Sequence, residues 1–159
     1  MHIWSSLTGK ILMTFLISMV PVIELRGAIP IATANGLNFG IAILVSVLGN
    51  LVPVPFIIIF IRKIFAWMRG KSRWLDRLVT KLEKRAEMKS KTVLQYAFWG
   101  LFIFVAIPVP RTGAWTGALI AAMLDMRLKN AFPAIALGVV TAGIIVAFVT
   151  CGAGTLLFS

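Results

Sequence analysis

The segment spanning residues 21–30 constrains this chain most, because it places two charged side chains inside apolar sequence. Glu24 and Arg26 stand two residues apart, and Ile, Val and Leu-rich stretches lie on both sides. A charged side chain at the centre of a membrane helix costs about 2.5–3.5 kcal/mol. The segment also contains residues that interrupt or turn a helix, namely Pro21, Gly27 and Pro30. We interpret it as a broken helix that is buried in protein or lines a wet cavity at membrane depth.

Composition supports that membrane setting. The 159 residues are 60% hydrophobic and 13% charged, whereas a soluble domain carries about 25% charged residues. We therefore expect a single integral membrane domain. Cys151 is the only cysteine and His2 the only histidine, so we expect no disulfide within the chain, no metal site and no cofactor. The sequence has no metalloprotease, nucleophile-elbow or phosphate-loop motif, so we expect no enzyme activity.

The basic residues are concentrated in one connector, residues 62–91. This stretch holds 11 of the 16 Lys and Arg residues and three acidic residues, so it carries +8 of the formal net charge of +11. A basic loop between apolar blocks is typical of the cytoplasmic side of a plasma or inner membrane. We expect it to contact anionic lipids rather than nucleic acid. From Trp74 onward its apolar residues follow helical spacing, which fits an amphipathic helix on the membrane or, equally well, a solvated linker helix.

The first part of the chain contains two short apolar pieces and one long one. Residues 11–23 and 28–36 are shorter than the roughly 20 residues that a membrane helix needs. Residues 39–61 are long enough to cross, and they contain Asn50. We expect a kink or break midway along this span, at Pro53 and Pro55.

The second part repeats this plan. Apolar residues 93–107 and 114–124 are again short, and residues 131–158 form a second full span. Between the short pieces lies another broken, charged motif, Pro108-Val109-Pro110-Arg111-Thr112-Gly113.

The shared plan predicts an all-α inverted repeat. Repeat 1 covers residues 1–61 and repeat 2 covers residues 92–159, each with a re-entrant helical hairpin followed by a transmembrane helix. If each hairpin turns back, each repeat crosses the membrane once, and the two repeats run in opposite senses around the cytoplasmic connector. Such hairpins meet near the midplane in many transporters. The alternative is four to six ordinary spans that happen to contain prolines.

These motifs resemble those of the small multidrug export protein family, which is thought to be distantly related to the DedA-type, or VTT-domain, membrane proteins. The resemblance covers nearly the whole chain and rests on Pro21, Glu24, Arg26, Gly27, Pro30, Gly49, Asn50, Pro53, Pro55, Pro108, Pro110, Arg111, Thr112, Gly113 and Gly117. It implies two facing re-entrant hairpins that carry acidic and arginine residues. It also implies movement of lipids or polyprenyl phosphate carriers, coupled to an ion gradient. The second motif departs from this pattern, since it has no carboxylate close to Arg111.

The candidate substrate-binding site consists of Glu24, Arg26 and Arg111, with Asn50 and Thr112 beside them. Two guanidinium groups and one carboxylate carry a net charge of +1, which favours an anion such as a phosphate headgroup. Amide groups at half-helix N-termini, near Ala28 and Ala114, would add to this attraction. Burial disfavours an ionised carboxyl group, so Glu24 is the candidate for coupling to protons, and sodium is the other candidate ion. The alternative is a structural ion pair between Glu24 and one arginine.

The sequence thus predicts an ion-coupled transporter or flippase for an anionic amphiphile, such as a lipid phosphate. One alternative is an exporter of small amphiphilic drugs, and another is a membrane scaffold without transport. We expect a homodimer, since a midplane cavity needs more walls than this chain supplies. Asn50 either completes the cavity or bridges helices, and Thr112 either holds a backbone carbonyl group or contacts the ligand.

Overall fold

The computed structural model of this chain describes residues 6–69, 77, 91–109 and 112–158. Within those ranges every regular element is a helix, which confirms the predicted all-α class. The helices are α1 (Leu7–Met19), α2 (Glu24–Ala34), α3 (Phe39–Leu51), α4 (Pro53–Arg69), α6 (Lys91–Ala106), α7 (Ala114–Met123) and α8 (Leu128–Phe158).

The first break is shorter than the sequence predicts. Helix α1 ends at Met19, and Pro21 lies in the turn that leads to α2, as predicted. Because α2 already begins at Glu24, the prediction that Gly27 and Pro30 also break the chain is wrong. Both residues lie inside α2, so the break consists of residues 20–23 alone.

Packing explains why α2 continues through its glycine and proline. A β-carbon at position 27 would overlap the side chain of Ile23, so Gly27 permits a close contact rather than a turn. Pro30 lies in a helix with a buried inner face. Ala28, Ile29 and Ala32 on this face have no exposed surface. The apolar burial of this face offsets the cost of a proline in the second turn.

The predicted break in the first long span is confirmed. Helix α3 ends at Leu51 and α4 begins at Pro53, with Pro55 in the first turn of α4, where a missing amide donor does little harm. Helix α4 continues to Arg69, so the first residues of the predicted connector extend this helix. The amphipathic helix predicted from Trp74 onward lies outside the described residues, apart from Arg77.

Helices α2 and α7 end with the same hydrogen-bonding pattern. After α2, the amides of Gly36 and Leu37 donate to the carbonyl groups of Thr33 and Ala32. After α7, the amides of Asp125 and Met126 donate to the carbonyl groups of Ala122 and Ala121.

This pattern is the Schellman motif, and it needs one residue in the left-handed region. Gly36 fills that position after α2 with φ +76°, and Asp125 fills it after α7 with φ +50°. The same type of turn therefore follows both helices.

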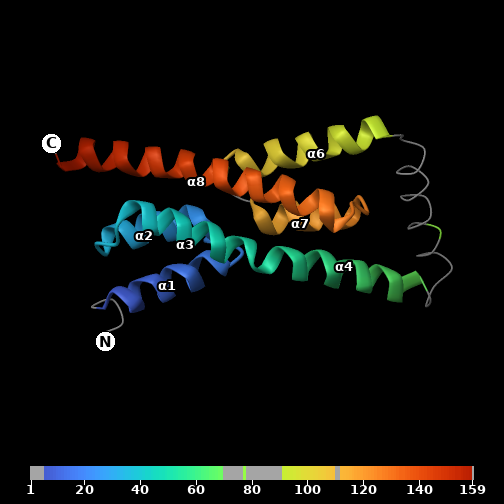
Figure 1. Cartoon of the computed structure of the whole chain (residues 1–159), viewed down its shortest axis with the longest axis horizontal. Helices are drawn as coiled ribbons and strands as arrows, with labels where there is room; N and C mark the ends of the chain where they lie inside the picture. The colour runs from blue at the N-terminus through green and yellow to red at the C-terminus, as the bar shows by residue number, and fades with distance from the viewer. Residues whose placement is uncertain (1–5, 70–76, 78–90, 110–111, 159) are drawn as a thin grey trace.

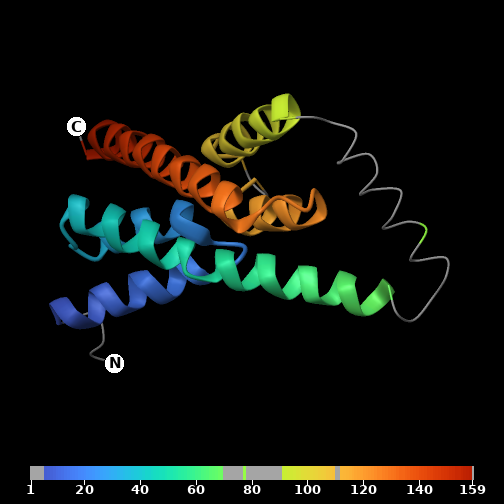
Figure 2. The same ribbon diagram turned by 45° about the vertical axis from the view of Figure 1, so that its right-hand side comes forward.

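The helices form two pairs of short helices and two long paths (Figures 1 and 2). Helix α1 runs toward the middle of the molecule and α2 turns back beside it, while α6 and α7 do the same from the other end. The α3–α4 path and α8 run the length of the molecule in opposite directions. Helix α1 packs on α3, α6 packs on α8, and α7 packs on α4.

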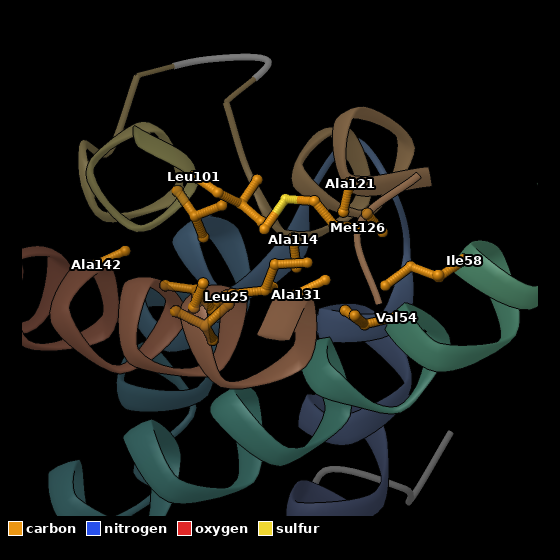
Figure 3. Packing of buried hydrophobic residues seen from close by; sticks show 14 of the residues in the cluster. Leu25, Val54, Ile58, Leu101, Ala114, Ala121, Met126, Ala131 and Ala142 are labelled. Carbon is orange, nitrogen blue, oxygen red and sulfur yellow. The ribbon is translucent and has the colours of Figure 1, made fainter. Parts of the chain in front are cut away.

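The core lies where the helices cross (Figure 3). It is built mostly from small and branched apolar residues of α2, α4, α6, α7 and α8, including Leu25, Val54, Leu101, Ala114 and Ala131. Alanines at these contacts let helices approach closely, which is how helices associate in lipid.

The outer surface is apolar as well. Phe56 and Phe60 of α4 are 69% and 64% exposed, and Phe148 of α8 is 75% exposed. Residues Phe39–Trp67 and Leu128–Gly152 are long and apolar enough to cross a membrane. Large exposed aromatic side chains on such helices are expected of a protein whose solvent is lipid.

Candidate functional site

The two charged breaks meet near the middle of the molecule. The guanidinium group of Arg26, on α2, donates hydrogen bonds to the carbonyl oxygen of Ile107 at 3.4 Å and to Oγ1 of Thr112 at 3.2 Å. The indole group of Trp115, on α7, donates to the carbonyl oxygen of Met19 at 3.1 Å. These three hydrogen bonds, between residues more than 80 positions apart, therefore hold the region of the first break against the region of the second.

Glu24 caps the N-terminus of α7 from the other break. Its side chain is only 6% exposed, and its Oε1 accepts a hydrogen bond from the amide of Trp115 at 3.4 Å. A carboxylate at this position interacts favourably with the helix dipole and with an amide that has no partner inside the helix. The backbone of Glu24 has φ +50°, a conformation that costs a side-chain-bearing residue free energy.

Gly113 is the residue against which Glu24 packs. A β-carbon at position 113 would overlap the carboxylate group of Glu24. Gly113 has an extended backbone, φ −156°, that any residue can adopt. The requirement for glycine is therefore one of space, not of backbone freedom.

This capping changes the role expected for the half-helix N-termini. Helix α2 begins at Glu24 rather than near Ala28, so Ala28 has no N-terminal amide to offer. Helix α7 begins at Ala114 as predicted, but the amide of Trp115 is already bonded to Glu24. Among the described groups, the cationic side chain of Arg26 is thus the stronger attraction for an anion.

Arg26 has no carboxylate partner among the described residues. The acceptors of its guanidinium group are a carbonyl oxygen and a hydroxyl oxygen. The one ion pair within the described part of the chain joins Arg62 of α4 to Asp125 after α7, where Nε of Arg62 lies 3.0 Å from Oδ1 of Asp125. Its hydrogen-bond partners therefore orient the guanidinium group, and the acid that acts on its charge is Glu24, through space and without a salt bridge.

Thr112 stabilises the second break. Its Oγ1 lies 2.9 Å from the carbonyl oxygens of both Ile107 and Val109, to which it donates, and it accepts the hydrogen bond from Arg26. Thr112 therefore holds backbone carbonyl groups and positions a guanidinium group at the same time.

Asn50 of α3 lies behind Glu24. It is 1% exposed, and neither its Oδ1 nor its Nδ2 has a hydrogen-bond partner among the described residues. Asn50 and Glu24 line the same narrow space in the interior. Asn50 thus lies beside the candidate site, and the two roles predicted for it, completing the cavity and bridging helices, stay predictions.

An open pocket of about 700 Å³ also has Glu24 and Arg26 in its lining. Its apolar walls come from the two breaks and include Pro21, Val22, Ile23 and Pro108. Pockets of this size hold drug-sized ligands or headgroups. Within the described lining, the pocket thus combines one cation, one acid and an apolar rim.

Two predicted site residues, Pro110 and Arg111, lie outside the described residues. Glu24, Arg26, Asn50 and Thr112 are brought together. No group of three or more His, Cys, Asp or Glu side chains in the described part of the chain is arranged to hold a metal ion.

A family model described as "Putative small multi-drug export protein" matches residues 24–145. The chain belongs to this family. No curated protein and no solved structure matches it significantly. The matched region of this small multidrug export protein begins at Glu24 and contains all four of the described candidate site residues. Family membership and the two long apolar helices together make it a membrane protein of an export family.

Sequence reasoning missed two partners in the site of this export protein. The carbonyl group of Ile107 carries no side-chain signal, so only the structure reveals it. Trp115 could have been found from the sequence, because it lies two residues after Gly113 in the second break. An indole N–H group that is partly buried normally has a hydrogen-bond partner.

Proposed function

We propose that this protein is a membrane transporter that moves an anionic amphiphile, such as a lipid phosphate, through the site between its two breaks. The observation that carries the proposal is the position of Arg26 in the open pocket, where it donates to neutral oxygens and forms no salt bridge with a described carboxylate group. A guanidinium group held by neutral oxygens keeps its charge available for a phosphate group, which it can bind through two parallel hydrogen bonds.

The pocket suits a ligand with a charged end and an apolar chain. Arg26 supplies the charge, while Val22 is 90% exposed and Ile23 and Pro108 lie on the same wall. The acyl or polyprenyl chain of such a ligand would lie along this apolar wall, with its headgroup at Arg26. Arg111 is expected to add a second positive charge from the other break.

Glu24 is the candidate for ion coupling. It is the one acidic residue of the described pocket lining, and its carboxylate contacts the N-terminus of α7. Binding of a proton or a sodium ion would weaken that contact and so change how the two breaks are held together. Coupling to an ion gradient would act through this change.

Matching positions in the two halves support an inverted repeat. In α3, Gly49 packs on α1, where a β-carbon would lie 2.6 Å from the carbonyl oxygen of Phe15. In α8, Gly138 packs on α6 in the same way, 3.0 Å from the carbonyl oxygen of Phe102. Gly138 comes 89 residues after Gly49, so two equivalent crossings recur at a fixed spacing.

The same spacing of 89 residues relates other pairs around the centre. Gly36 and Asp125, the left-handed residues after α2 and α7, are one such pair. Further pairs line the narrow space beside Asn50: Glu24 with Gly113, Leu25 with Ala114, and Asn50 with Val139. We infer that this space lies on a pseudo-two-fold axis, as in transporters built from inverted repeats.

In this topology α1–α2 and α6–α7 are re-entrant hairpins that enter from opposite faces of the plasma or inner membrane. The basic residues 62–91 then lie in the cytoplasm. Repeat 1 spans residues 1–61 and repeat 2 spans residues 92–159. A homodimer would supply the outer walls that the open pocket lacks.

The family description favours a second candidate, the export of small amphiphilic drugs. A cationic drug would need an acid that is not committed elsewhere, whereas Glu24 is bonded to α7. A scaffold without transport would not need an unneutralised arginine in an open pocket. The resemblance to DedA-type proteins agrees with the lipid proposal and stays a prediction.

Binding of phosphatidic acid by the purified protein tests the proposal. We expect Arg26→Gln to weaken binding by about tenfold or more, because a charge-assisted hydrogen bond contributes about 1.5–3 kcal/mol. Arg62→Gln, which removes a cation from α4, is the matched control and should leave binding unchanged. Equal binding by Arg26→Gln and the wild type would refute the anion site, and preferential binding of cationic amphiphiles would favour drug export.

A further inference from the structure

The open pocket and the narrow interior space share two lining residues. Glu24 and Arg26 line both of them. The interior space is too narrow, as it stands, to admit a water molecule. Asn50 lines the interior space but not the open pocket, so Glu24 and Arg26 are the residues that a ligand in the open pocket would pass to reach it, and we call this pair the partition.

Asn50 is the feature that this arrangement leaves unexplained. Both polar atoms of its amide group are buried without a partner among the described residues. Burying an amide without hydrogen bonds is costly, and native proteins rarely do so without a functional reason. Because the space is too narrow for water, Asn50 would gain a partner among the described residues when a neighbouring side chain moves or a ligand group enters.

Glu24 is the group best placed to move. Its hydrogen bond to the amide of Trp115, at 3.4 Å, is longer than the usual range for N–H···O bonds. Its backbone lies in the left-handed region, φ +50°. Glu24 is thus held weakly in a disfavoured conformation, and it borders the same narrow space as Asn50.

We propose that Glu24 is a gate with two positions, and that the amide group of Asn50 is its second hydrogen-bond partner. In the first position, the one in this structure, Glu24 caps α7 and closes the partition. In the second position the carboxylate group leaves Gly113 and bonds to Asn50, which joins the open pocket to the interior space. This proposal rests on the proposed transport function, since the group that passes the gate is the anionic headgroup held at Arg26.

The charges explain how substrate would operate the gate. An anion at Arg26 repels the nearby carboxylate group of Glu24 through a poorly screened interior. The Nδ2 group of Asn50 is a neutral donor on the far side of the partition. A headgroup in the open pocket therefore favours the second position, which is a shift between two existing states rather than a new fold.

A direct test measures access to the interior space. The single cysteine is replaced by Cys151→Ser, and Val139→Cys places a thiol in the lining of the narrow space, where Val139 is 1% exposed. We expect a thiol reagent to modify this protein slowly in neutral detergent, and about tenfold faster when phosphatidic acid is added. Adding Asn50→Leu, which has similar volume but no donor, should abolish the acceleration.

Thermal unfolding of the Asn50 variants and one control substitution separate a loss of the gate from a loss of the fold. Asn50→Leu should keep or raise the midpoint of thermal unfolding, because it removes unpartnered buried atoms, and Asn50→Ala is the second variant if leucine does not fit. Ser46→Ala is the matched control: Ser46 is also buried and unpartnered among the described residues, one turn earlier on α3, but does not line the space. Ser46→Ala should retain the acceleration.

Two outcomes would overturn the proposal that Glu24 is a gate, and a third would overturn the proposed transport function. Undiminished acceleration in Asn50→Leu and Asn50→Ala would show that Asn50 is not the second partner. A large loss of stability in both variants would show that its amide is already satisfied. Absence of phosphatidic acid binding by the wild type would instead refute the proposed function on which the gate depends.

Discussion

The carboxylate group of Glu24 occupies the space that a β-carbon at position 113 would need, so the two breaks of the chain interlock through an acid and a glycine. The amide of Trp115 also donates a hydrogen bond to Glu24, at 3.4 Å, from the α7 side of the same contact. This contact joins the first break to the second, and the candidate pocket lies directly beside it.

Gly113→Ala should destabilise the protein by about 1–3 kcal/mol, because an added methyl group overlaps a buried side chain. Thermal unfolding in detergent measures this effect. Gly100→Ala is the control: a β-carbon there meets nothing within 4 Å, and replacing a helical glycine by alanine should stabilise by about 0.5–1 kcal/mol. In the double variant with Glu24→Ala, the cost of Gly113→Ala should largely disappear. Simple additivity would contradict the contact.

Thr112→Val should weaken phosphatidic acid binding by about fivefold, since Arg26 loses one of its two positioning acceptors, worth about 1 kcal/mol. Titration of the lipid against the purified variant provides the measurement. Thr141→Val is the control, because the hydrogen bond that Thr141 forms in the described part of the chain is to the carbonyl oxygen of Leu137 in its own helix. A binding constant unchanged by Thr112→Val would mean that Thr112 does not position Arg26 for the ligand.

Gly49→Ala and Gly138→Ala should each destabilise by about 1–3 kcal/mol, because each glycine lets a long helix contact the backbone of a short one. Gly143→Ala is the matched control in α8: its β-carbon would lie 3.4 Å from the side chain of Val47, an ordinary contact. The inverted-repeat proposal requires losses of similar size at positions 49 and 138. A loss at only one position would count against equivalence of the two crossings.

Asp125→Asn should cost less than about 1 kcal/mol, because the ion pair with Arg62 is partly exposed. Asparagine tolerates the left-handed backbone at this position, so the substitution tests the charge and not the turn. The difference in unfolding free energy between the wild type and Asp125→Asn should shrink as salt is added. A salt-independent difference would show that the charge pair is not its origin.

Single cysteines introduced at positions 36 and 125 test the membrane topology. These residues end α2 and α7, and the two turns lie at opposite ends of the molecule (Figure 1). In a Cys151→Ser background, an impermeant thiol reagent should label the two positions from opposite sides of the membrane. Labelling of both from one side would exclude re-entrant hairpins of opposite sense.

The sequence by itself determined the helical class, the two long spans and the position of the charged breaks. These properties follow from local causes: apolar length for the spans, proline at positions 21 and 53, and a left-handed turn at Gly36. The same local logic failed at Gly27 and Pro30, where burial of one face of α2 outweighs the intrinsic preference of these residues.

Only the tertiary structure decided how the two breaks are joined. Glu24 bonds to an amide 91 residues away, Arg26 bonds to a carbonyl group 81 residues away, and Asn50 is left without a partner among the described residues. Backbone amides and carbonyl groups are present at every position, so no sequence pattern indicates which of them a distant side chain will reach. Helix packing decides which backbone group a side chain reaches. In this protein it makes Glu24 the cap of α7 and not the salt-bridge partner of Arg26.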